Sequence, residues 1–132
     1  MAVFRTNSRA AIVVAAMIGL FLLLQSPALQ AHTFTASSDV SIRFDDGKFK
    51  GRVESSRESC EKNRNVEVFK KRSHRPDLFI GYDKTNDNGR YSIPKPKGIK
   101  GRFYARVERR ETGRYQHEHK CRGDTSGIIE AP

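Results

Sequence analysis

The sequence predicts an all-β domain, a sandwich of about seven short antiparallel strands, preceded by an N-terminal signal helix. Apolar residues alternate with polar residues in several short runs. Turn signals built from Gly, Pro, Asn and Asp separate these runs at intervals of roughly 8–12 residues. After the N-terminal segment, no window has a sustained apolar period of 3.6 residues. Together these observations favour strands over helices throughout the domain.

The first 31 residues have the order of regions found in a secretory signal peptide. Arg5 and Arg9 supply positive charge, 10–24 is an uncharged apolar run, and 25–31 is a short polar stretch with small residues. The apolar run is shorter than the ~20 residues needed to cross a membrane. We therefore expect export to the periplasm or the medium, with cleavage after Ala31 or, as a weaker site, after Ala28. The alternative is an uncleaved anchor, which would be the one link to a membrane.

The expected mature chain is a single basic domain. The whole chain has a formal net charge of +10, and the two signal arginines leave a charge of +8 on the rest. Cys60 and Cys121 both lie in the mature part, and two cysteines in an exported chain most simply form one disulfide. We expect 32–38 to be a flexible lead-in and 39–132 to be the sandwich.

The first half of the domain predicts a hairpin and a third strand. Residues 40–44 and 49–53 have apolar residues at alternate positions, and the turn signal Asp45-Asp46-Gly47 lies between them. A polar connection over 55–63 follows, and then 65–69 predicts the next strand.

The second half contains four further predicted strands, at 78–82, 90–93, 103–107 and 128–129. Asn86-Asp87-Asn88-Gly89 is the strongest turn signal, because Asn and Gly tolerate positive φ. Pro94 ends the strand that follows this turn, and 111–120 predicts a charged loop or irregular strand. We expect eight residues of the domain to face a common core: Val66, Val68, Ile80, Tyr91, Ile93, Phe103, Ala105 and Val107.

Several segments occur in an order that is familiar from one superfamily. They are Phe49-Lys50-Gly51-Arg52-Val53, Cys60, Arg64-Asn65-Val66-Glu67-Val68, Thr85 to Ile93, Gly101 to Val107, and Cys121. This order resembles the carboxypeptidase-regulatory-like domains of the transthyretin (prealbumin)-like superfamily, over roughly 49–129. The family usually has Asp where this chain has Asn86. The resemblance implies a prealbumin-like Greek-key sandwich of seven strands, usually an accessory, adhesive or stabilising module and not an enzyme.

The sequence contains no nucleophile elbow, phosphate-binding glycine loop or zinc-protease motif, so we expect a non-catalytic binding or structural module without a cofactor. One alternative is a copper-binding protein. Cleavage after Ala31 would give His32 a free α-amine beside its own imidazole, and His117 or His119 would complete a nitrogen ligand set suited to Cu(II). The competing interpretation is that these are a frayed terminus and surface histidines.

A second alternative is a cationic protein associated with anionic envelope components or polysaccharide. The basic residues occur in clusters, and the candidates for binding a polyanion are Lys70, Lys71, Arg72, Arg106, Arg109 and Arg110. A dedicated nucleic-acid partner is not expected, because the chain has no recognition motif for one and is predicted to be exported.

Overall fold

The computed structural model describes residues 32–113 and 117–132, and this part of the chain is all-β, as predicted. It contains one 3-10 turn, η1 (Glu58–Cys60), and twelve strands: β1 (His32–Ala36), β2 (Ser38–Val40), β3 (Arg43–Asp45), β4 (Lys48–Ser55), β5 (Asn65–Lys70), β6 (Leu78–Lys84), β7 (Arg90–Pro94), β8 (Gly101–Val107), β9 (Arg110–Thr112), β10 (His117–Cys121), β11 (Asp124–Thr125) and β12 (Ile129–Ala131). The predicted signal helix and its cleavage sites lie outside the described residues. In the described ranges, no helix has the length and apolar character required to span a membrane.

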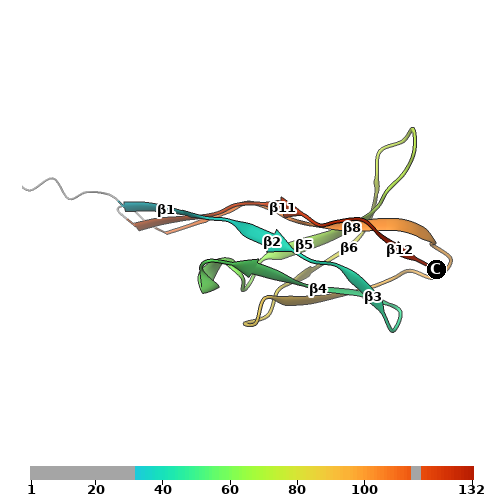
Figure 1. The fold of residues 1–132 in the computed structure, drawn as a ribbon, viewed down its shortest axis with the longest axis horizontal. Coiled ribbons are helices and arrows are strands. Elements are labelled where there is room, and N and C mark those ends of the chain that lie inside the picture. Colours follow the sequence, from blue (N-terminus) through green and yellow to red (C-terminus); the bar gives the residue numbers. More distant parts are fainter. Residues whose placement is uncertain (1–31, 114–116) are drawn as a thin grey trace, which may run out of the picture. The chain divides into compact units, whose positions relative to one another are not determined.

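The strands form three sheets (Figure 1). In the four-stranded sheet, β4 pairs with β2, β3 and β7. In the five-stranded sheet, β8 pairs with β11, β12 and β5, and β5 also pairs with the edge strand β6. A small third sheet has the order β1-β10-β9. All pairs are antiparallel except β1 with β10, which is parallel.

The four-stranded and five-stranded sheets share one hydrophobic core. Its buried members are Val40, Phe49, Val53, Val66, Val68, Tyr91, Ile93, Phe103, Ala105, Val107 and Ala131. The rings of Phe49 on β4 and Phe103 on β8 have centroids 4.7 Å apart, so the contact joins the two sheets. Seven of the eight predicted core residues belong to this cluster, and the eighth, Ile80, is partly buried against it.

Two predicted turns are confirmed. Asp46 and Gly47, both with positive φ, connect β3 to β4 as a two-residue hairpin loop. Asn86 holds the turn between β6 and β7, where its side-chain oxygen accepts hydrogen bonds from the N–H groups of Asn88 and Arg90.

Other segments differ from the sequence-based expectation. The predicted strand at 40–44 is divided into β2 and β3, because the N–H of Arg52 donates to the Ser41 side-chain oxygen where a continuous ladder would use a backbone carbonyl. The expected lead-in at 32–38 contains β1 and the start of β2. For the charged segment 111–120, the strand alternative fits better than the loop, because the segment contributes to β9 and contains most of β10.

The Cys60–Cys121 disulfide is present and connects η1 to β10, with the two Cα atoms 5.4 Å apart. Arg64 lies nearby with 1% of its surface exposed. Its guanidinium donates to the carbonyl oxygens of Cys60 (2.7 Å), Glu108 (2.7 Å) and Arg122 (3.0 Å) and to the side-chain oxygen of Ser38 (2.9 Å). One buried cation therefore joins four separate parts of the chain beside the disulfide.

Candidate functional site

A groove of about 830 Å³ lies on the outer face of the four-stranded sheet. Strands β3, β4 and β7 form its floor, and residues at the end of β6 and in the following turn form one wall. The charged residues in its lining are five cations and one carboxylate: Arg43, Lys50, Arg52, Lys84, Arg90 and Asp83. We call this feature the cationic groove.

Strand register brings the cations of the groove together. Arg43 on β3 is the direct partner of Lys50 on β4, and Arg52 on β4 is the direct partner of Arg90 on β7. Partners in an antiparallel pair point to the same face of the sheet, and like charges placed directly opposite one another destabilise the pair. The floor of the groove therefore contains two repulsive cross-strand pairs side by side.

Acidic neighbours offset part of this repulsion. The ammonium of Lys50 lies 2.7 Å from Asp45, and this hydrogen bond lowers the pKa of the Asp45 carboxyl. The guanidinium of Arg52 lies 3.5 Å from a carboxylate oxygen of Glu54 and 3.8 Å from one of Glu61.

Three cations of the groove are not balanced in this way. Among the described residues, Arg43, Lys84 and Arg90 make no ion pair within 4.0 Å. Asp83 makes no ion pair with them within 4.0 Å; one of its oxygens accepts the N–H of Lys84 and the other accepts the N–H of Ser92, each at 2.8 Å. The groove thus presents a net positive surface to solvent.

The groove rests on a rigid support. The Tyr91 hydroxyl donates to the Ser41 carbonyl oxygen at 2.6 Å, and burial raises the pKa of this tyrosine. Gly51 lies beside this hydrogen bond. A Cβ atom at Gly51 would be 2.0 Å from the Ser41 carbonyl oxygen and 2.6 Å from the Tyr91 hydroxyl, so a larger residue would clash.

The basic residues singled out from the sequence lie elsewhere. Lys71 pairs with Asp77 at 3.2 Å, Arg106 pairs with Glu67 at 2.7 Å, and Arg109 pairs with Glu111. Arg110 donates to three backbone carbonyls around η1, those of Ser59, Lys62 and Asn63. The structure thus gives most of these candidates a nearby acid or backbone partner.

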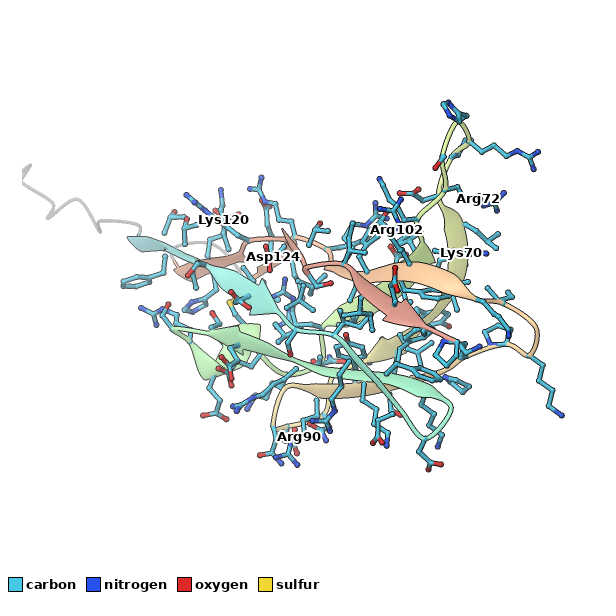
Figure 2. All side chains as sticks on the ribbon, turned by 45° about the vertical axis from the view of Figure 1, so that its right-hand side comes forward. Lys70, Arg72, Arg90, Arg102, Lys120 and Asp124 are labelled. Atoms are coloured by element: carbon cyan, nitrogen blue, oxygen red, sulfur yellow. A yellow bond between two sulfur atoms is a disulfide. The ribbon has the colours of Figure 1, made fainter. Side chains whose placement is uncertain are left out.

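Lys70 and Arg72 lie in a different place from the groove. Figure 2 shows them with Arg102 at the base of the β5–β6 loop, while Arg90 lies on the other side of the ribbon. The N–H of Lys71 donates to the Arg102 carbonyl at 2.8 Å, which confirms that β8 and this loop are adjacent. The basic residues that the sequence suggested as polyanion-binding candidates therefore lie on a different surface from the cationic groove.

The candidate copper ligands lie on two paired strands. The parallel register makes His32 on β1 the partner of His117 on β10, and Phe34 the partner of His119. The rings of Phe34 and His119 are stacked, with centroids 6.1 Å apart. The Nδ1 atom of His119 is buried without a hydrogen-bond partner. For His32 and His117 the structure describes the strand positions alone, and the described side chains contain no group of three or more His, Cys, Asp or Glu placed to hold a metal ion.

No family model, curated protein or solved structure matches this chain. The resemblance to carboxypeptidase-regulatory-like domains therefore stays a prediction, and the geometry described above is the basis for a functional proposal.

Proposed function

We propose that the mature chain is an exported, non-catalytic β-sandwich module that binds an anionic polysaccharide in the cationic groove. The shared core of the two main sheets and the pattern of short antiparallel strands support the sandwich, and the disulfide is consistent with export. The observation that favours this ligand most is that two cross-strand pairs on the groove floor each consist of two cations.

The charge arrangement is more favourable with an anion bound than without one. Arg43 opposite Lys50 and Arg52 opposite Arg90 repel each other in the free protein. Carboxylate or sulfate groups placed between them would convert this repulsion into charge-assisted hydrogen bonds. Such a ligand would thus stabilise the fold as well as occupy the groove.

The remaining lining suits a sugar chain. Ser41, Asn86 and Ser92 provide hydroxyl and amide groups beside the cations, while the Tyr91 ring is buried beneath them. Hydroxyl and amide groups pair with sugar hydroxyls, whereas binding of single-stranded nucleic acid uses exposed rings on which bases stack. The one carboxylate in the lining, Asp83, already accepts two backbone N–H groups, which disfavours a role as a general base.

Binding to alginate, a carboxylated polysaccharide, tests this proposal. Replacing the three unbalanced cations by Ala in one variant (R43A, K84A and R90A) should weaken binding about tenfold, because each exposed ion pair contributes about 0.2–1 kcal/mol. The control variant removes the same charge from exposed positions outside the groove (R75A, K97A and K100A) and should change the affinity less than about threefold. Calorimetric titration at low and at physiological salt measures both.

Two results would contradict the proposal. Equal loss of affinity in the two triple variants would show attraction to net charge alone. Absence of binding to both alginate and the sulfated polysaccharide heparin at low salt would remove the proposed ligand class.

Copper binding is a second candidate, favoured by the register that makes His32 the partner of His117. The test is Cu(II) titration of protein whose intact mass shows cleavage after Ala31. The comparison proteins are a form with one extra residue before His32 and the variant H117A/H119A. We expect weak binding that is similar in all three. Tight stoichiometric binding that is lost in both altered proteins would instead establish the copper site.

A further inference from the structure

The edge strand β6 contains a β-bulge that changes which side chains face outward. Val68 on β5 is the partner of Gly81, but the next residue, Phe69, is the partner of Phe79, so Ile80 has no partner in the ladder. Glu67 is the partner of Tyr82. Because Glu67 and Phe69 are two residues apart, their partners Tyr82 and Phe79 share one face of the sheet. Without the bulge, positions 79 and 82 would point to opposite faces.

Both aromatic rings lie on the outer face of the five-stranded sheet and are open to solvent. Phe79 is 49% exposed and Tyr82 is 64% exposed. Behind them, Phe69 contacts Phe79 edge-on, with centroids 5.7 Å apart, and stacks on Tyr104 at 5.5 Å. The Arg106 guanidinium covers Phe69, 4.6 Å from its centroid. The supporting rings are thus fixed in place, and Phe79 and Tyr82 remain available for a ligand.

Polar groups border these rings on two sides. On one side Arg106 pairs with Glu67 at 2.7 Å. On the other side Asp77 accepts hydrogen bonds from the Tyr104 hydroxyl at 2.9 Å and from the Lys71 ammonium at 3.2 Å. Each border therefore contains a carboxylate paired with a cation, and offers both donors and acceptors.

We propose that this outer face of the five-stranded sheet is a carbohydrate-binding surface on which Phe79 and Tyr82 stack against the rings of a polysaccharide. A pyranose ring has an apolar C–H face, which complements an exposed aromatic ring, and a rim of hydroxyls, which need both donors and acceptors. The paired donors and acceptors of the borders suit uncharged hydroxyls, whereas a chain of phosphates would meet the carboxylates of Glu67 and Asp77. This surface lies on a different sheet from the cationic groove, so the inference does not depend on the groove.

Neutral polysaccharides provide the test, because they have no anionic groups that the cationic groove could bind. Retention of the protein should be measured by affinity electrophoresis in gels that contain a neutral polysaccharide: hydroxyethyl cellulose, glycol chitin or a β-1,3-glucan. We expect retention by at least one of these polysaccharides. The variant F79A/Y82A should bind it at least about tenfold more weakly than the wild type. Retention should persist in high salt, which screens the attraction between alginate and the groove.

Matched variants separate ring stacking from other causes. Y82F keeps the ring and should keep the binding, whereas F79L keeps an apolar side chain without the ring and should weaken it. F34A removes an exposed ring from β1 and should have no effect. The groove variant R43A/K84A/R90A should bind the neutral polysaccharide normally, so failure of one surface is distinguishable from failure of the other.

Three outcomes would overturn the inference. They are absence of retention by all the neutral polysaccharides, retention that is unchanged in F79A/Y82A, and retention of F79L equal to that of the wild type. Sedimentation velocity of the wild type and F79A/Y82A adds a further check. A dimer that is lost in the variant would assign this face to self-association instead.

Discussion

At the scale of single residues, two buried polar side chains lie in opposite electrostatic situations. Arg64 is charged and has carbonyl and hydroxyl partners. Burial, with a smaller effect of Arg110, lowers its pKa to about 10, so it stays protonated at neutral pH. Tyr91 is neutral, and burial raises its pKa. Burying the charged Arg64 guanidinium lowers the free energy of unfolding at neutral pH. Burying the neutral Tyr91 phenol has no such charge cost until the pH is high enough to ionise it.

Tyr91 therefore makes stability sensitive to alkali. Its folded pKa lies above the unfolded value of about 10, so its contribution is complete below pH 10 and is lost as the pH rises further. At pH 7, Y91F should lose about 0.5–1.5 kcal/mol, because the hydrogen bond to the Ser41 carbonyl is removed. Above about pH 10 this deficit should shrink, since phenylalanine has no proton to lose. Urea unfolding at both pH values measures the difference.

The exposed Tyr82 provides the control. Y82F should leave the unfolding free energy unchanged at either pH, because Tyr82 is 64% exposed, whereas Tyr91 is buried. The effect of Arg64 is present in every variant and cancels in the comparison. A deficit of Y91F that stays constant or grows with pH would contradict the assignment.

At the scale of strands and turns, short-range signals were sufficient for most of the main core. Asp46-Gly47 and the Asn86–Gly89 segment have the residues that their turns require, and the alternation in β5, β7 and β8 identified the buried face. The bulge in β6 was not predictable in this way, because residues 78–82 form an apolar run without alternation. The run indicated a strand without indicating which ring would be exposed.

The candidate groove was also missed by sequence reasoning. Cations that are adjacent in sequence, such as Lys70, Lys71 and Arg72, are the more obvious candidates for an anion site. The groove cations are not adjacent in sequence and lie on β3, β4, β6 and β7, and only register places Arg52 beside Arg90. A signal for the groove was available in the sequence, because single cations occur at outward positions of the strands on both sides of a predicted turn. Strand β1 was missed for a related reason, because its pairing with β10 is distant in sequence.

At the scale of the whole domain, two outer faces differ in the ligand chemistry that they favour. The four-stranded sheet presents a groove lined by cations, whereas the five-stranded sheet presents two exposed rings between borders that each contain an ion pair. If both proposals hold, one module would contact an acidic chain on one face and a neutral chain on the other. Such a module links polysaccharides without catalysing a reaction, which fits the proposed accessory role.

The disulfide determines how firmly the third sheet is attached to this domain. Apart from its strand pairing, the third sheet has only a small buried cluster beside β1 and β10, formed by Ala36, Cys60 and Cys121. The main core has eleven buried residues. Replacing both cysteines by Ala should lower the unfolding free energy by about 4 kcal/mol, as expected for a closed loop of about 60 residues. Protection from hydrogen exchange should fall most in β1, β9 and β10, because they lose the covalent link, and should persist longest in β5 and β8, which lie in the main core. Hydrogen-exchange mass spectrometry of the wild type and the double variant measures this pattern. If β5 and β8 lose as much protection as the third sheet, or if exchange in β1 and β10 is unchanged, the disulfide is not what attaches the third sheet to the domain.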